Sequence, residues 1–168
     1  AVRYCCKNSK SPIYLRIGKS GEKNFTIDAL EKWKFGKIRK IVNGNDICIL
    51  TYGPIIKKAF KLRENLAKKN FNVSIYSCST LKPFDNKRLK KIFMKYKNVI
   101  VIEDHSVING LSQIVKVEAF ENRYLGNIID FNLQDKFLNN YESQDALQST
   151  HGLDNKLIFK KTLIALNR

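Results

Sequence analysis

The 168-residue sequence predicts an α/β fold: a three-layer α/β/α sandwich around a mostly parallel sheet of about five strands, one of them antiparallel. Strand-like apolar runs alternate with segments of helical periodicity, and such alternation implies parallel strands joined by right-handed crossovers. An Asn-Gly pair between the first two runs predicts the antiparallel member. The 43% hydrophobic content is enough to close one core.

The beginning of the chain predicts a helix and then a strand. The alternating apolar stretch SPIYLRIGK ends near Gly18, and the polar passage that follows is typical of a linker. We expect residues 1–20 to be the tail of a preceding domain, residues 21–32 to be a linker, and residues 33–168 to form the main domain.

Residues 36–53 contain two strand-like runs on either side of Asn43-Gly44. Asn-Gly favours the positive φ angles of a two-residue hairpin turn. We therefore expect the first two strands to pair antiparallel.

A one-sided amphipathic helix should follow within residues 54–70. Pro54 suits a helix start. The apolar side chains then recur at helical spacing, at Ile55, Ile56, Ala59, Phe60, Leu62 and Leu66.

Strands and helices continue to alternate along the rest of the chain. The expected elements are a strand at 71–79, a helix from Asp85, a strand at 98–104, a weak helix at 111–120, a strand at 126–133 and a closing helix at 154–167. Asp85 and Asp154 are suited to cap the helices that follow them. Residues 134–151 show no clear pattern.

Composition excludes several functional classes. No apolar run is long enough for a membrane helix, and no cysteine pair has the C-x-x-C spacing of a zinc site, so we expect free thiols and a cytoplasmic protein without a metal site. The net charge of +16 comes mainly from lysine, which supplies 24 of the 31 basic residues and is spread along the chain. Arginine, which makes bidentate phosphate contacts, is scarce. We therefore interpret the charge as a solvated surface and do not expect nucleic-acid binding.

The stretch VIVIEDHSVING places Glu103, Asp104 and His105 at the end of a buried strand. Open α/β sheets hold ligands at this edge. Neighbouring residues on an extended chain point to opposite sides, so the three cannot converge on one atom as a triad or a zinc site. The structural alternative is that Glu103 and His105 pair with backbone groups or with each other and so fix the loop to Gly110.

Five landmarks, in order, resemble the C-terminal domain of transketolase-like thiamine diphosphate-dependent enzymes. They are SPIYLRIGK at 11–19, Tyr52-Gly53, LKPFD at 81–85, the EDH strand end at 103–105 and HGLD at 151–154. The family commonly has Gly-Pro where Ser11-Pro12 stands and a double glycine where Asn109-Gly110 stands. The resemblance implies the same sandwich fold and makes residues 1–20 the tail of a pyrimidine-binding domain.

The resemblance also implies which functional residues lie in this chain and which lie in earlier domains. Relatives place a basic residue against the phosphate of a sugar-phosphate acceptor, and Lys19 stands there with Arg16 just before it. A solvated loop lysine is the alternative. Glu103, Asp104 and His105 would border the substrate channel. The GDG…N loop that holds Mg²⁺ and diphosphate, and the activating glutamate, belong to earlier domains and are not found here.

We therefore expect no catalytic residue and no bound cofactor in this chain alone. Thiamine diphosphate and Mg²⁺ would belong to the full enzyme, a homodimer in which upstream domains, in the same chain or a separate subunit, move a two-carbon ketol unit between sugar phosphates. Deoxyxylulose phosphate synthase and the β subunits of 2-oxo acid dehydrogenases share these landmarks and stay open. So does a non-catalytic partner-binding or regulatory module, because fold does not decide function.

Overall fold

The computed structural model describes residues 1–8, 10–18, 23–139 and 141–167. Its strands are β1 (Arg39–Val42), β2 (Ile47–Thr51), β3 (Val73–Ser77), β4 (Asn98–Ser106) and β5 (Asn127–Leu133). Its helices are α1 (Val2–Asn8), α2 (Ile56–Ala67, after a 3-10 turn at Gly53–Ile55), α3 (Asn86–Lys95), α4 (Leu111–Glu121), α5 (Gln144–Thr150) and α6 (Asn155–Leu166).

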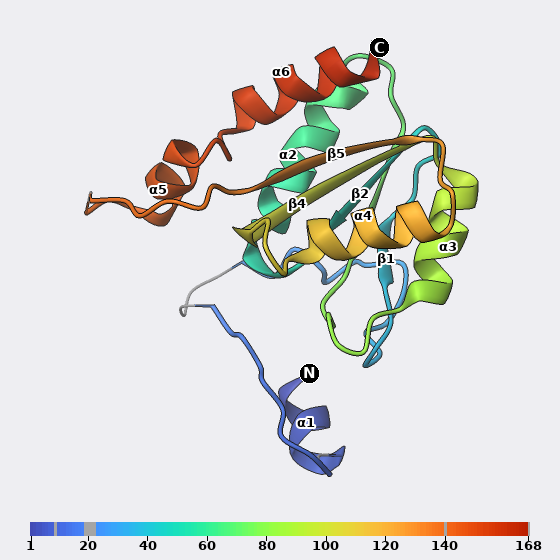
Figure 1. Ribbon diagram of the computed structural model, residues 1–168, viewed down its shortest axis with the longest axis vertical. Coiled ribbons are helices and arrows are strands. Elements are labelled where there is room, and N and C mark those ends of the chain that lie inside the picture. Colours follow the sequence, from blue (N-terminus) through green and yellow to red (C-terminus); the bar gives the residue numbers. More distant parts are fainter. Residues whose placement is uncertain (9, 19–22, 140, 168) are drawn as a thin grey trace.

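The five strands form one sheet in the order β1-β3-β2-β4-β5. All neighbouring pairs are parallel except β1 with β3. Helices α2 and α6 lie on one face of the sheet, and α3 and α4 lie on the other (Figure 1). The predicted fold class, with five strands of which one is antiparallel, is therefore confirmed.

Two apolar layers hold the helices to the sheet. Successive side chains of a strand point to opposite faces. Ile49 and Ile100 accordingly join the layer beneath α2 and α6, while Leu50 and Val101 join the layer beneath α3 and α4. The central strands are buried on both faces, which explains why β2 and β4 appear in the sequence as continuous apolar runs.

The predicted hairpin between the first two strands is wrong. β1 pairs with β3, and β2 lies on the far side of β3. Neither Asn43 nor Gly44 has the positive φ that a hairpin turn of this type requires. Instead, the link passes close to the start of β3, where the backbone amides of Asn45 and Asp46 both donate to the Asn72 carbonyl.

Close approach, rather than turn geometry, explains the glycine in this link. A Cβ on Gly44 would lie 2.3 Å from the carbonyl carbon of Val73. The Gly44 carbonyl accepts hydrogen bonds from the Ser74 hydroxyl (2.8 Å) and the Tyr96 hydroxyl (2.9 Å). The crossing is thus fixed by β3 and by the end of α3.

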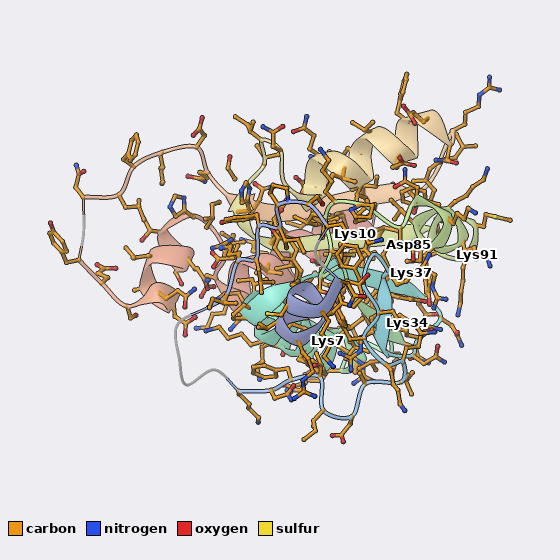
Figure 2. All side chains as sticks on the ribbon, turned by 90° about the horizontal axis from the view of Figure 1, so that it is seen from below. Lys7, Lys10, Lys34, Lys37, Asp85 and Lys91 are labelled. Atoms are coloured by element: carbon orange, nitrogen blue, oxygen red, sulfur yellow. The ribbon has the colours of Figure 1, made fainter. Side chains whose placement is uncertain are left out.

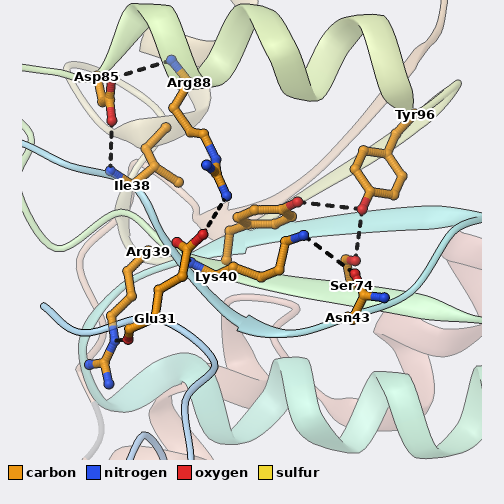
Figure 3. A network of polar contacts seen from close by, with 10 residues as sticks. Glu31, Ile38, Arg39, Lys40, Asn43, Ser74, Asp85, Arg88 and Tyr96 are labelled. Atoms are coloured by element: carbon orange, nitrogen blue, oxygen red, sulfur yellow. Dashed lines mark hydrogen bonds and ion pairs between the residues drawn. The ribbon is translucent and has the colours of Figure 1, made fainter.

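A polar network fastens the segment before β1 to α3 (Figure 3). The Glu31 carboxylate accepts from the Arg88 guanidinium and from the Lys40 amide, each at 2.8 Å. Asp85 accepts from the Ile38 amide at 3.2 Å. These contacts hold β1 beside β3, because they connect the chain on both sides of β1's first residue to the helix that follows β3.

At the beginning of the chain, α1 lies at the margin of the molecule in the view of Figure 1, and its Tyr4 ring stacks on Phe35 in the segment before β1. Helix α1 (Val2–Asn8) is the helix predicted at the beginning of the chain. Residues 11–17 are extended but belong to no strand, so the predicted strand is not formed within the described residues. In the expected linker, residues 23–32 pack on the body: Phe25 stacks on Phe60 and the Leu30 amide donates to the Ile41 carbonyl.

Two aspartates cap helices as predicted, in different ways. Asp154 uses the single oxygen Oδ1 for the Lys156 and Leu157 amides. Asp85 divides its oxygens, with Oδ1 for the Arg88 amide and Oδ2 for the Ile38 amide.

Asparagine substitutions at these two caps should have different effects on the free energy of unfolding. Asp154→Asn keeps an accepting oxygen, and asparagine is as good a cap as aspartate, so the free energy of unfolding should be nearly unchanged. Asp85→Asn turns an NH₂ group toward the partly enclosed Ile38 amide and should cost about 1 to 3 kcal/mol. Urea denaturation followed by circular dichroism measures both, and equal losses would contradict the divided role of Asp85.

Candidate functional site at the carboxyl end of β4

Glu103 is a buried carboxylate that holds the beginning of helix α4. Its side chain is fully enclosed, and its two oxygens accept from the Leu111 amide (2.7 Å) and the Ser112 amide (2.8 Å). These amides belong to the first turn of the helix, where N–H groups lack intrahelical partners and the helix dipole favours negative charge. Glu103 thus does what the structural alternative expects, binding backbone.

Gly110 is required by this carboxylate. A Cβ at Gly110 would lie 2.5 Å from Glu103 Oε2 and 2.6 Å from the Ser106 carbonyl oxygen. Only glycine lets the loop bring the α4 amides against Glu103, so the turn at Asn109-Gly110 serves the carboxylate.

Tyr52 is the third partner of Glu103. It follows β2, the neighbour of β4 in the sheet, and its hydroxyl donates to Glu103 Oε2 at 3.4 Å. Burial raises the pKa of Tyr52 well above its usual value, and the Glu103 carboxylate raises it further. The phenol therefore stays protonated and acts as a hydrogen-bond donor. Sequence analysis singled out Tyr52 as a landmark but not as a partner of Glu103.

Asp104 points away from Glu103 and joins two distant segments. Its carbonyl accepts from the Arg16 guanidinium at 2.9 Å, and its carboxylate lies 3.9 Å from Arg16 Nη2. The Gln144 amide, at the start of α5, donates to the same carboxylate at 3.2 Å. Asp104 therefore gathers the N-terminal segment and α5 at the carboxyl end of β4.

The remaining predicted residues are His105 and the two candidates for binding a substrate phosphate, Arg16 and Lys19. The Nδ1 atom of His105 lies 2.9 Å from the carbonyl oxygen of its neighbour Ser106. Arg16 is occupied by Asp104, although its side chain is still 54% exposed. Lys19 lies outside the described residues. Glu103, Asp104 and His105 thus have different partners: the amides of α4, the Arg16 and Gln144 side chains, and the Ser106 carbonyl.

A buried lysine near this edge was missed by sequence analysis. Lys58, in the first turn of α2, is only 5% exposed and lies 3.7 Å from Asp145 of α5, which also pairs with Lys57 at 2.7 Å. Burial lowers the pKa of Lys58, and Asp145 opposes that effect. No pattern in the sequence links Lys58 to residues 134–151, so tertiary packing alone reveals this contact.

The basic surface does not mark a single groove. Lys7, Lys10, Lys34, Lys37 and Lys91 lie on the side of the molecule that carries Asp85 (Figure 2). Other exposed lysines lie across the sheet, among them Lys61 on α2, Lys68 directly after α2 and Lys160 on α6. Basic charge thus surrounds the body.

Neither a metal cluster nor a membrane span occurs in the part of the chain that the structure describes. No three His, Cys, Asp or Glu side chains gather there in a way that could hold a metal ion. No described helix has the length and apolar character needed to cross a bilayer.

The sequence matches the family model of the transketolase C-terminal domain over residues 36–158. The chain belongs to this family. The match covers most of the sandwich, from the residues before β1 into α6, and the domain's strand-end loop from Glu103 to Gly110 lies within it.

Curated relatives of the domain are longer proteins. It is 25% identical over 156 residues to 1-deoxy-D-xylulose-5-phosphate synthase of Clostridium tetani, covering 93% of this chain and 25% of that protein. It is 30% identical over 132 residues to the enzyme of the same name from Bacteroides fragilis, covering 78% of this chain and 20% of that protein. The chain thus spans about a quarter of the length of such relatives.

Solved structures show the same fold. A split gene transketolase, described as an inactive β4 tetramer, matches with a TM-score of 0.85 at 23% identity, over 99% of this chain and 53% of that one. Transketolase from Campylobacter jejuni matches with a TM-score of 0.52 at 10% identity, over 88% of this chain and 20% of that one.

Glu103 and Asp104, the carboxylates at this strand end, do not fit a Mg²⁺-diphosphate group. Such a group needs several hard oxygen ligands placed together. Both oxygens of Glu103 are occupied by backbone amides, and Asp104 is engaged by Arg16 and Gln144. These contacts make the strand end a structural junction, and the exposed side chain of Arg16 lies at its rim.

Proposed function

We propose that this chain is the C-terminal domain of a transketolase-type, thiamine diphosphate-dependent enzyme of the cytoplasm, which transfers a two-carbon ketol unit between sugar phosphates. The observation that carries the proposal is the family match over residues 36–158 in a chain that covers 25% of the length of its Clostridium tetani relative. The domain would support a homodimer and border the substrate channel, while the cofactor and the catalytic groups would lie in upstream domains.

The N-terminal segment supports this division. Residues 11–17 are extended, belong to no strand of the described sheet, and expose apolar side chains such as Tyr14 and Ile17. An extended segment of this kind can add to the sheet edge of another domain. We assign residues 1–20 to the tail of a pyrimidine-binding domain, residues 21–32 to a linker and residues 33–168 to the C-terminal domain.

The strand-end junction supports a place beside the substrate channel. Arg16 lies at the rim of the carboxyl edge, against Asp104, and Lys19 follows three residues later. In this proposal Arg16 and Lys19 attract the phosphate of the acceptor sugar, Lys19 as a point charge. Glu103, Asp104 and His105 hold that edge in shape and do not react with substrate.

Calorimetry of thiamine diphosphate binding tests the proposal. The chain alone should bind no thiamine diphosphate with Mg²⁺, whereas a sample that contains the upstream domains should bind it, and removal of Mg²⁺ should abolish that binding. Absence of binding in both samples would overturn the proposal and favour a non-catalytic partner-binding module. Binding by the chain alone would overturn the assignment of the cofactor to the upstream domains.

A second candidate reaction follows from the names of the relatives. Several of them are 1-deoxy-D-xylulose-5-phosphate synthases. Mass spectrometry of the products of the complete enzyme distinguishes the candidates, because one yields 1-deoxy-D-xylulose 5-phosphate and the other a pair of exchanged sugar phosphates. The β subunit of a 2-oxo acid dehydrogenase would yield neither.

A further inference from the structure

The first turn of α5 is fixed to two other parts of the fold. Asp145 pairs with Lys57 at 2.7 Å and lies 3.7 Å from Lys58, and both lysines belong to the first turn of α2. Its neighbour Gln144 donates from Nε2 to Oδ2 of Asp104 at 3.2 Å. The beginning of α5 therefore connects α2 with the carboxyl end of β4.

The contact with α2 holds the first turn of α5 in one position. The Lys58 side chain is only 5% exposed, and a buried ammonium group needs a negative charge beside it. Asp145 supplies that charge. The hydrogen bond from Lys57 and the charges of both lysines in turn hold the pKa of Asp145 below its usual value. Gln144, the preceding residue, is thereby placed against β4.

The alternation of side chains along β4 explains why α5 reaches Asp104. Glu103 points to the sheet face covered by α4, where it accepts from the α4 amides. The next residue of a strand points to the opposite face, and α2 covers that face. In Figure 1, α5 lies on the side of the molecule where the arrowhead of β4 ends. Gln144 and Asp104 therefore meet at the carboxyl edge.

One oxygen of Asp104 lies between α5 and the N-terminal segment. Oδ2, which accepts from Gln144, lies 3.9 Å from Nη2 of Arg16. Nη1 of Arg16 donates to the Asp104 carbonyl oxygen at 2.9 Å. The Asp104 side chain is only 17% exposed, so the hydrogen bond from Gln144 fixes the direction in which its charge faces Arg16.

From these contacts we propose that Gln144 is a positioning residue for phosphate recognition: it holds the Asp104 carboxylate, which in turn orients Arg16 toward the phosphate of the acceptor sugar. The inference rests on the proposed function, in which Arg16 attracts that phosphate. Gln144 itself does not touch the substrate. It acts through Asp104, so it deepens the account of the site without adding a reacting group.

The distances fit a carboxylate that orients the guanidinium without competing for it. At 3.9 Å, Oδ2 attracts Nη2 of Arg16 but is too far away for a hydrogen bond. Gln144 holds Oδ2 at this distance. The Arg16 side chain is 54% exposed, and its planar fork of N–H donors suits a phosphate. Pre-orientation also reduces the side-chain entropy that Arg16 loses when it binds.

Kinetics of the complete enzyme give the first test. Gln144→Met removes the donor while keeping the length and the neutral charge of the side chain. It should raise KM for an aldose phosphate acceptor about two- to fivefold, the size expected for one partly exposed charged contact, and leave kcat nearly unchanged. KM for the same aldose without its phosphate should stay at the wild-type value, which a general loss of structure would not produce.

Two comparisons show whether Gln144 acts through Asp104. Gln134→Met makes the same replacement at an exposed position before α5 and should leave both KM values unchanged. In an Asp104→Ala background, Gln144→Met should have no further effect on KM, because the contact that it removes is already absent. A full additional rise in that background would overturn the inference. Circular dichroism confirms that each variant is folded.

Trypsin cleavage after Arg16 tests the structural step without any activity. Cleavage requires that Arg16 leaves Asp104 and enters the protease, so its rate follows the population of the released segment. On the purified chain, Gln144→Met should increase this rate at least about twofold, as measured by mass spectrometry, while Gln134→Met should not. An unchanged rate would overturn the inference.

Failure of the inference and failure of the proposed function give different results. If the complete sample binds thiamine diphosphate and uses the aldose phosphate, but Gln144→Met leaves its KM unchanged or raises KM equally for both acceptors, the function stands and the inference is wrong. If the complete sample binds no thiamine diphosphate, the proposed function is wrong and the inference falls with it.

Discussion

Replacement of Glu103 by alanine should lower the free energy of unfolding by about 3 to 5 kcal/mol, because two hydrogen bonds from backbone amides to a buried carboxylate are lost at once. The first turn of α4 would keep two enclosed donors without partners. Chemical denaturation, followed by circular dichroism, measures the loss. Glu103→Gln keeps one accepting oxygen and should fall between alanine and the wild type.

A matched control uses a carboxylate with no such role. Glu142 is exposed in the loop before α5, and Glu142→Ala should leave the denaturation midpoint nearly unchanged. If Glu103→Ala unfolds at the same denaturant concentration as the wild type, Glu103 does not hold α4. A loss of activity in the complete enzyme without a loss of stability would then give the residue a direct part in the substrate channel.

Alanine at Gly44 should cost about 3 kcal/mol or more and is expected to have the second largest effect. The added Cβ would lie 2.3 Å from the Val73 carbonyl carbon and 2.5 Å from the Ser74 amide nitrogen. Backbone atoms in a central strand cannot move aside as a flexible side chain can, so the clash must displace the link or β3. The same denaturation experiment measures the effect.

Gly53 provides the control for Gly44. It has a φ of +66°, but nothing lies within 4 Å of the position that a Cβ would take. Gly53→Ala should therefore cost only about 1 to 2 kcal/mol, the backbone preference alone. If Gly44→Ala were as mild as Gly53→Ala, close approach of the link to β3 would not be the reason for the glycine at this position.

The part of the site that can be predicted from the sequence consists of residues that lie close together along the chain. Glu103, Asp104 and His105 follow a buried apolar run, and Gly110 follows them, so a shaped strand-end loop was evident from the sequence. The hydrogen-bond partners of these residues could not be predicted from the sequence. Tyr52 lies 51 positions before Glu103, and Arg16 lies 88 positions before Asp104. Contacts over such separations depend on which strands are neighbours, and periodicity carries no information about that.

The sequence by itself determined the fold class, the number of strands and the two capped helices, because apolar periodicity and capping chemistry are local properties. The tertiary structure alone decided that β1 pairs with β3, since Gly44 admits either a tight turn or a close crossing and only the packing against Val73 selects the crossing. It alone also decided that Lys58 is buried beside Asp145 and that Val117 and Phe120 of α4 are exposed, because burial depends on which elements meet in space.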